Sequence, residues 1–182
     1  MTDESTFVAS LTRRLGPAHA GETWSGDDAA VVRPPSGDLL LAIDPMVQGV
    51  HFLEPTADVG WAAVARNVSD IAAMGGRPLH ALVSIVLPPG AEVTLLLDGL
   101  VEAHERLCPI VGGDTSSGAT LVITVAITGT VDGMPVLRSG ARPGDGLFVT
   151  GPLGAAPARP VPRLAEGSAA REGGFSHSRR AS

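Results

Sequence analysis

The chain has 182 residues, of which 44% are hydrophobic and 18% charged, and its net charge at pH 7 is −6. This length suits one domain with a core of its own, and the negative charge argues against nucleic acid as a partner. Lysine is absent, so all 13 cationic side chains are arginines, which excludes a Walker-A phosphate loop and a Schiff-base mechanism. The single cysteine, Cys108, excludes an internal disulfide and a cysteine-rich zinc site.

The first residues do not predict a secretory signal. Residues 1–5 read Met-Thr-Asp-Glu-Ser, without the basic start and apolar stretch of a secretory signal. No apolar run reaches the roughly 18 residues needed to span a membrane. We therefore expect a cytoplasmic protein without a membrane partner.

The hydrophobic pattern predicts helices and strands in alternation. Two glycines and Pro78 end the clearest helix, and residues 112–114 are placed at a strand end. The run 120–130 alternates as a strand that buries one face fully and the other partly. In chain order, we predict a helix at 7–15, strands at 29–32 and 39–43, a helix at 59–74, a strand at 79–87, a helix at 92–107, a strand at 120–130, a hairpin-type turn at 132–133 and a strand at 147–150.

These elements predict an α+β fold, sandwich-like, with a mixed sheet covered by helices on one face. Several strands look buried on both sides, so a second copy of the chain is a candidate cover for the other face. We place the domain at residues 1–154, with 17 acidic side chains against 8 arginines. Residues 155–182 hold two acidic side chains against five arginines and show no periodicity, which predicts a low-complexity, disordered tail.

Four aspartates lie at or near the ends of predicted elements or on the polar side of the main helix, where functional side chains often lie. Asp28 follows Gly26-Asp27 before a predicted strand, Asp44 ends a strand, and Asp114 follows two glycines. Asp70 lies inside the main helix, on the side away from its apolar face. Carboxylates at element ends can converge on Mg²⁺, which takes oxygen ligands, and neighbouring glycines let a phosphate approach the backbone. The pattern indicates nucleotide–Mg²⁺ chemistry without a phosphate-binding lysine.

Each of these residues also has a simpler interpretation. Gly-Asp pairs are common in turns, which covers Asp28 and Asp114. Asp70 can pair with Arg66 one helical turn earlier, at about 0.3 kcal/mol. His51 alone is an ordinary surface or packed histidine. Composition and spacing by themselves leave both interpretations open.

Five motifs that follow one another along the chain favour the functional interpretation of these aspartates. They are Gly26-Asp27-Asp28-Ala29-Ala30, Asp44 followed by Gly49-Val50-His51-Phe52, the Asn-Val-Ser-Asp-Ile-Ala-Ala-Met-Gly run at 67–75, Gly112-Gly113-Asp114-Thr115, and residues 137–145 around Arg138. From about residue 5 to Gly154 the series resembles the N-terminal domain of thiamine-monophosphate kinase. The wider superfamily includes aminoimidazole ribonucleotide synthetase, selenophosphate synthetase and a hydrogenase-maturation protein.

The resemblance implies an ATP-dependent phosphorylation of thiamine monophosphate to thiamine diphosphate. It also implies several Mg²⁺ ions, ATP as co-substrate, and a homodimer whose sheets pack around a central barrel. Transfer between two anionic phosphates needs charge neutralisation and in-line positioning, so lysine is dispensable. The site residues implied are Asp28, Asp44, Asp70 and Asp114 as Mg²⁺ ligands, Gly113, Asp114 and Arg138 as ATP contacts, and His51 as a contact of thiamine monophosphate.

The chain departs from this family in two places. Ala42-Ile43 stands where the family has hydroxyl residues, which leaves only a main-chain contact from Ile43 to a metal. The resemblance implies a second domain after Gly154 that we do not expect in this chain, and the tail looks like a reading-frame change or an early end of the gene. We therefore expect impaired activity. The alternatives are an inactive, dimerising ATP–Mg²⁺-binding remnant, or another ATP-using member of the superfamily, which the helix around Asp70 argues against.

Overall fold

The computed structural model describes residues 4–25, 28–33, 36–139, 142–149, 160 and 162–172. None of the described helices combines the length and apolar character needed to cross a membrane. The elements are α1 (Glu4–Leu15), β1 (Asp38–Val47), α2 (Ala57–Ala73), β2 (Arg77–Leu87), α3 (Thr94–Arg106), β3 (Ile110–Ser117), β4 (Val122–Val131) and α4 (Leu164–Glu172).

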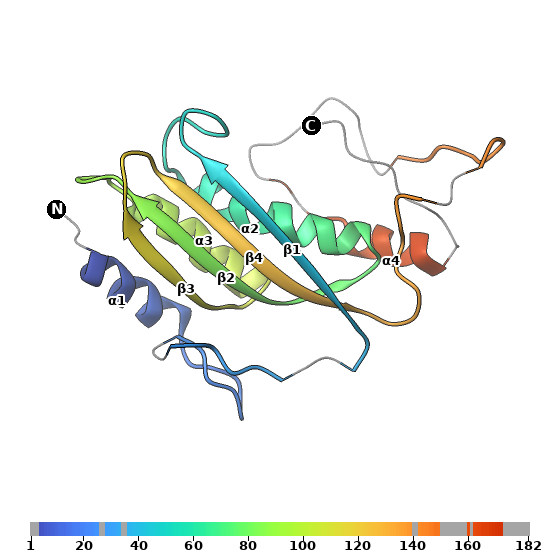
Figure 1. Ribbon diagram of the computed structural model, residues 1–182, viewed down its shortest axis with the longest axis horizontal. Coiled ribbons are helices and arrows are strands. Elements are labelled where there is room, and N and C mark those ends of the chain that lie inside the picture. Colours follow the sequence, from blue (N-terminus) through green and yellow to red (C-terminus); the bar gives the residue numbers. More distant parts are fainter. Residues whose placement is uncertain are drawn as a thin grey trace.

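The strands form one mixed, four-stranded sheet in the order β1-β4-β2-β3 (Figure 1). β4 is antiparallel to both β1 and β2, whereas β2 and β3 run parallel. A parallel pair requires a crossover connection, and α3 supplies it. The last strand in the sequence therefore lies between two strands that precede it.

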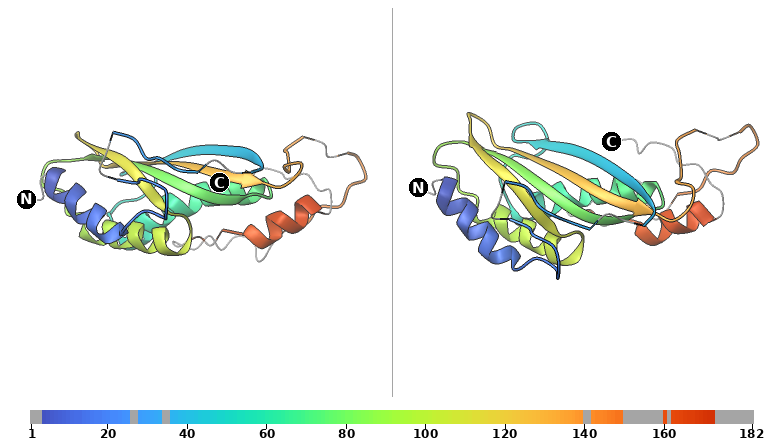
Figure 2. Two further views of the ribbon diagram at one scale, coloured as in Figure 1. Left: turned by 90° about the horizontal axis from the view of Figure 1, so that it is seen from below. Right: turned by 60° about the horizontal axis from the view of Figure 1, so that its bottom comes forward.

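α2 and α3 cover one face of the sheet, and α1 lies beside α3 and β3 (Figure 2). Two glycines let the backbones of α2 and α3 approach closely. A Cβ added to Gly99 would lie 1.8 Å from the carbonyl oxygen of Ala57, and one added to Gly60 would lie 2.2 Å from that of Leu96. Fully buried apolar side chains fill the layer between helices and sheet: Val64, Val68, Leu100, Ile123 and Val125.

The other face of the sheet is apolar and open. β4 alternates as predicted as far as Gly129, with every second residue from Ile123 buried and the intervening ones partly exposed, whereas Thr130 and Val131 are both buried. On β1, Leu39, Leu41 and Ile43 are 51%, 71% and 64% exposed. The described residues place no helix over these side chains, so the mixed α+β sheet with helices on one face is confirmed.

α4 corrects our expectation of disorder after Gly154. This helix lies on the end of α2, where a Cβ on Gly167 would be 1.8 Å from the carbonyl oxygen of Ala72. Leu164 contacts the core, and the indole N–H of Trp61 donates to the carbonyl oxygen of Pro160 at 2.7 Å. Composition does not reveal such a long-range contact. Residues 155–159, 161 and 173–182 lie outside the described residues.

Three local predictions also differ from the structure. Val31 forms only an isolated bridge with Thr23 rather than part of a strand at 29–32. Residues 147–149 form no strand, while Thr150 lies outside the described residues. The turn at 132–133 leads to no hairpin in the described chain, because the next segment returns to α2, where the amide of Val136 donates to the carbonyl oxygen of Met74 at 3.0 Å.

The close contact between α4 and α2 can be tested with Gly167→Val. The added side chain has no space against Ala72, so we expect unfolding to become easier by about 1–3 kcal/mol, the usual cost of overpacking. Urea denaturation of the full chain measures this change. Ala169→Val, at an exposed position on the same helix, is the matched control; equal effects of the two variants would contradict the contact.

Candidate functional site

Asp44 and Asp70 come together at the helix-covered side of the sheet. Asp44 lies opposite the buried Val125 in β4, so its side chain is on the face that α2 covers. Asp70 lies one turn before the end of α2. Contrary to our expectation, Asp44 does not end its strand, because β1 continues to Val47.

The electrostatics of Asp70 show that the two carboxylates influence each other. Partial burial raises the pKa of Asp70 above its ordinary value, and the nearby carboxylate of Asp44 raises it further. The guanidinium groups of Arg138 and Arg66 act in the opposite direction and lower this pKa. The site thus contains two acidic groups that repel each other, with two arginines close enough to offset part of the repulsion.

Arg138 reaches this site from a distant part of the sequence. It follows β4, in the segment that the hydrogen bond between Val136 and Met74 holds against the end of α2. Its side chain is exposed. The structure therefore brings together Asp44, Asp70 and Arg138, three of the residues that the sequence singled out.

Asp114 lies elsewhere in this copy of the chain. It is inside β3, opposite Ser84 of β2, rather than at a strand end. Its neighbour Gly113 pairs with Val83, and Val83 pairs with Val125, whose side chain is on the helix-covered face. Successive residues of a strand point to opposite faces, so the side chain of Asp114 is on the open face. Three strand spacings, roughly 14 Å, separate β3 from β1. Asp44 and Asp114 therefore lie at opposite edges and on opposite faces.

Gly113 has a steric reason to be glycine. A Cβ at this position would lie 1.9 Å from the carbonyl oxygen of Val83 on the neighbouring strand. The missing side chain thus lets β3 pair closely with β2. This packing explains the glycine without a ligand, and β3 continues to Ser117 through the residues at which we expected a strand to end.

Asp28 lies at a bend in the loop between α1 and β1, with an exposed side chain. Its neighbours Gly26 and Asp27 lie outside the described residues. Ile43 is within β1, an edge strand of the sheet, opposite Ala126. Its side chain points to the open face, while alternate carbonyl groups of an edge strand point away from the sheet.

His51 occupies a tight turn at the end of β1. Its ring atom Nδ1 accepts a hydrogen bond from the amide of Val47 at 3.0 Å, and its own amide donates to the carbonyl oxygen of Val47 at 2.8 Å. Gly49 turns the chain here with φ +81°. Because Nδ1 is an acceptor, the neutral ring carries its proton on Nε2. His51 can therefore offer an N–H donor to a ligand.

Asn67 is a residue to which the sequence argument assigned no role. It is fully buried in α2, and its Nδ2 donates to the carbonyl oxygen of Ala63 at 3.0 Å. Its Oδ1 is buried without a hydrogen-bond partner, which is uncommon in folded proteins. The sequence feature that could have pointed to Asn67 was its position three residues before Asp70, in the same motif.

The chemistry of Asp44 and Asp70 fits one Mg²⁺ ion bound together with a phosphate. Mg²⁺ is held by one or two carboxylates, waters and substrate phosphates, and a cation between the two aspartates would relieve their repulsion. The described residues contain no group of three or more His, Cys, Asp or Glu side chains that could hold a metal. Within one chain, a cage of four aspartates is therefore not formed by the residues seen here.

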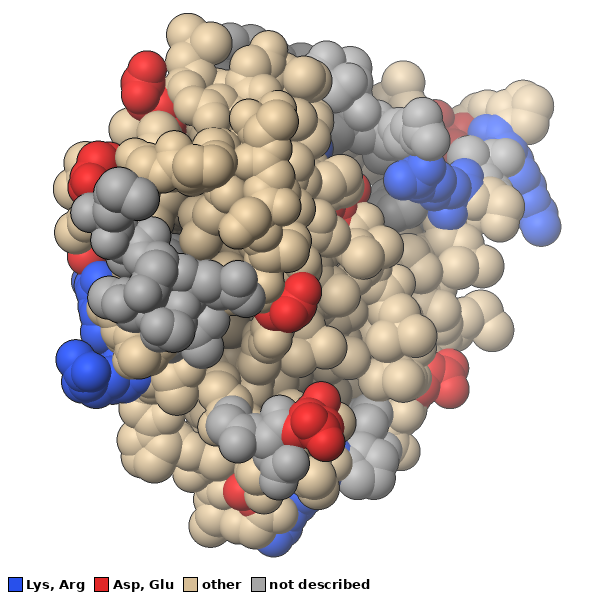
Figure 3. Space-filling view, turned by 60° about the vertical axis from the view of Figure 1, so that its left-hand side comes forward, with Lys and Arg blue, Asp and Glu red and all other residues tan. Residues whose placement is uncertain are grey.

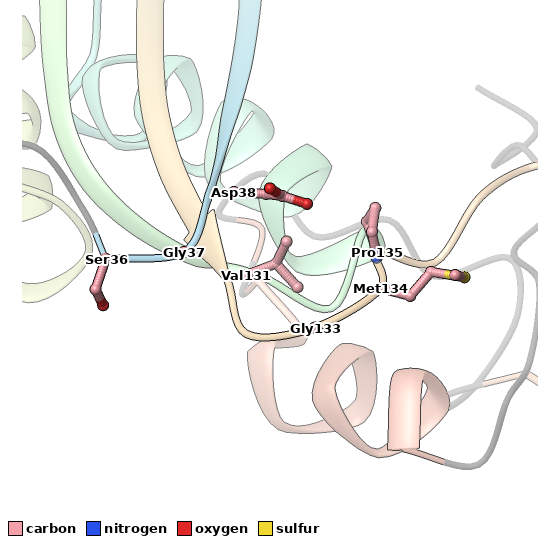
Figure 4. A pocket seen from close by; sticks show the side chains of 7 residues that line it. All are labelled: Ser36, Gly37, Asp38, Val131, Gly133, Met134 and Pro135. Atoms are coloured by element: carbon pink, nitrogen blue, oxygen red, sulfur yellow. The ribbon is translucent and has the colours of Figure 1, made fainter.

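A shallow depression near the start of β1 is not part of this site (Figure 4). Asp38, which lies there, is six residues before Asp44, on the order of 20 Å along an extended strand. Among the lining side chains, Asp38 alone is titratable. The residues that line the depression are Ser36, Gly37, Asp38, Val131, Gly133, Met134 and Pro135.

A family model matches most of the domain that contains Asp44 and Asp70. Residues 26–131 match the family model described as "AIR synthase related protein, N-terminal domain". The chain is 37% identical over 166 residues to a thiamine-monophosphate kinase of Bacillus subtilis, an alignment that covers 86% of this chain and 51% of that protein. The chain thus spans about half the length of the curated relatives it matches.

Two solved structures are similar in fold. Thiamine-monophosphate kinase from Stenotrophomonas maltophilia superposes with a TM-score of 0.75 at 28% identity, over 91% of this chain and 63% of that one. AaThiL complexed with AMPPCP and TMP superposes with a TM-score of 0.67 at 30% identity, over 93% and 62%.

The coupling between the two carboxylates predicts the effect of Asp44→Asn. Removing the neighbouring charge should lower the pKa of Asp70, whereas Arg138→Gln should raise it, and NMR titration of the Asp70 carboxyl measures both. In the folded chain this pKa lies above the unfolded value, so the stabilising contribution of Asp70 is present at low pH and is lost as pH rises through it. Asp114→Asn, on the other face, is the control. An unchanged pKa in Asp44→Asn would show that the carboxylates are not coupled.

Proposed function

The chain belongs to the family of AIR synthase related proteins, N-terminal domain, and we propose that it is the ATP- and Mg²⁺-binding part of a kinase for thiamine monophosphate. The relatives it matches are named thiamine-monophosphate kinase, and a structure similar in fold is complexed with AMPPCP and TMP. The observation that carries the proposal is the convergence of Asp44, Asp70 and Arg138 in one place.

In this proposal, Asp44 and Asp70 hold Mg²⁺ with the phosphates of ATP. When bound, Mg²⁺ neutralises the charge on the phosphates and helps to align them. Arg138 presents a planar guanidinium fork to phosphate oxygens. The remaining assignments are Asp28 and the carbonyl group of Ile43 as further metal ligands and His51 at thiamine monophosphate. Within one chain, Gly113 and Asp114 lie at the opposite edge of the sheet and cannot share the ion of Asp44 and Asp70.

The chain's own residues then serve mainly to position two phosphates. A phosphate oxygen of thiamine monophosphate attacks the terminal phosphorus of ATP, and the bond to the ADP oxygen breaks. Such a transfer requires alignment and charge stabilisation rather than a covalent intermediate. The absence of lysine is compatible with this chemistry, because arginine and carboxylate-bound cations supply the positive charge.

The second candidate function is ATP–Mg²⁺ binding without transfer. It is favoured by the position of Asp114 away from the other two aspartates. A small displacement of one reactant from its in-line position can cost orders of magnitude in rate. The same carboxylates would still hold a nucleotide complex in this case.

The two candidate functions are separated by one set of measurements. Calorimetry with AMPPCP and Mg²⁺ should give saturable binding that weakens about tenfold or more in Asp70→Asn and is unchanged in Asp38→Asn, the control at the opposite end of β1. Incubation with ATP, Mg²⁺ and thiamine monophosphate then tests for thiamine diphosphate. Product supports the kinase, binding without product supports the second candidate, and absence of binding refutes both.

We also propose that the open face of the sheet packs against a second copy of the chain. Leu39, Leu41, Ile43 and Leu82 are all 47% or more exposed on this face, and a contiguous apolar surface of this kind marks an interaction site. Figure 3 shows one side of the molecule, where uncharged residues make up most of the described surface.

Leu41→Glu tests the dimer. Light scattering during size-exclusion chromatography should give twice the 18.5 kDa mass of one chain for the wild type and one chain for the variant, because a charge would be buried without a partner. Leu95→Glu, which introduces the same charge at an exposed position of α3, should remain dimeric. A monomeric wild type would rule out this interface.

A further inference from the structure

Outside the Asp44–Asp70 site, one carboxylate is nearly enclosed by its own loop. The side chain of Glu22 is only 7% exposed. Its Oε2 accepts a hydrogen bond from the indole N–H of Trp24 at 2.9 Å, and its Oε1 accepts one from the amide of Arg33 at 3.1 Å. The two donors stand on either side of Asp28, so the single carboxylate joins both arms of the loop that carries this residue.

The main chain reinforces the same closure. Thr23 and Val31 exchange two backbone hydrogen bonds, of 2.9 and 2.7 Å. The guanidinium of Arg33 lies over Gly21, where a Cβ would be only 2.5 Å from Nη2. Glu22 and this small bridge therefore fix the two ends of the loop next to each other.

The loop is held against the body of the domain through rings and a short polar contact. Trp24 is 7% exposed, and its ring stands edge-on to His104 of α3 and to His19, with centroid distances of 6.0 and 4.7 Å. Nε2 of His80, in β2, lies 3.8 Å from Oε2 of Glu22. The anchor thus reaches both the sheet and the helix layer.

Charge favours the ionised form of Glu22 in this position. The hydrogen bonds from Trp24 and Arg33 hold the pKa of Glu22 below its usual range, so it is ionised at neutral pH. Burial lowers the pKa of His80 in spite of the nearby carboxylate, so this ring is neutral at pH 7. The nearest further ionisable groups, His19 and Arg33, belong to the loop itself. The two hydrogen bonds and the packing of Trp24, rather than an ion pair, therefore fix the loop.

We propose that Glu22 is a positioning residue that fixes the Asp28 loop against β2 and α3. The inference rests on the proposed function in so far as Asp28 is a ligand of the ATP–Mg²⁺ complex. Glu22 itself faces inward, toward Trp24, Arg33 and His80, and it acts through the loop. Its carboxylate is suited to the role because it offers two acceptor oxygens, one to each arm.

Glu22→Gln removes one of these acceptors and keeps the shape of the side chain. Amide hydrogen exchange at Thr23 and Val31 should accelerate about tenfold or more, as expected from losing one hydrogen bond to a charged acceptor, while exchange in α2 stays unchanged. Glu92→Gln, at an exposed position before α3, is the matched control. Unchanged exchange in Glu22→Gln would overturn the proposal. If this variant does not fold, Trp24→Phe removes the indole donor while it keeps an aromatic ring at this position, and the same acceleration is expected.

A second readout separates positioning from general stability. The Mg²⁺ concentration needed for half-maximal AMPPCP binding should rise about tenfold in Glu22→Gln. In an Asp28→Asn background the same substitution should add little, because the two residues act on one site. Fully additive effects would overturn the link to Asp28. A wild-type chain that binds no nucleotide would refute the proposed function, and exchange at Thr23 and Val31 would still decide whether Glu22 fixes the loop.

Discussion

The meeting of two like charges, Asp44 and Asp70, is the constraint on which the site depends. One comes from an edge strand and the other from the helix above it, so they meet only when β1 and α2 pack in one register. Their repulsion opposes folding, and the nearby arginines Arg66 and Arg138 offset part of it. Burial of the apolar layer between α2 and the sheet supplies the stabilising free energy that holds them there. Such an arrangement stores an unfavourable interaction that a cation relieves.

The same packing explains why glycine recurs at the contacts between elements. Gly60 and Gly99 allow α2 and α3 to touch through their backbones, and Gly113 allows β3 to approach β2. At each of these positions any side chain would collide with a carbonyl group of the neighbouring element. Gly113 thus contributes to the geometry of the sheet, independently of any ligand.

Much of the fold follows from sequence periodicity, because α2, β2, α3 and β4 are long and strongly patterned. The limits of β1 and β3 do not follow, since they depend on pairing with distant strands. Asp114 illustrates this point: its face is set by its register with Ser84, which no local pattern encodes. The anchoring of Glu22 and the burial of Asn67 were missed for the same reason. A polar residue in a loop or on a helix gives no local sign that a distant element will cover it.

The position of β4 has a consequence for synthesis of the chain on the ribosome. β1 and β2 both pair with β4 and not with each other, so neither antiparallel ladder can form before β4 has emerged. Until then, β1 and β2 lack the strand that pairs with both of them. Only α2, α3 and the parallel β2–β3 pair can assemble before β4 is available. The sheet is therefore completed only after β4 has been synthesised, and until β4 is inserted the nascent domain exposes unpaired strand edges, which favour aggregation.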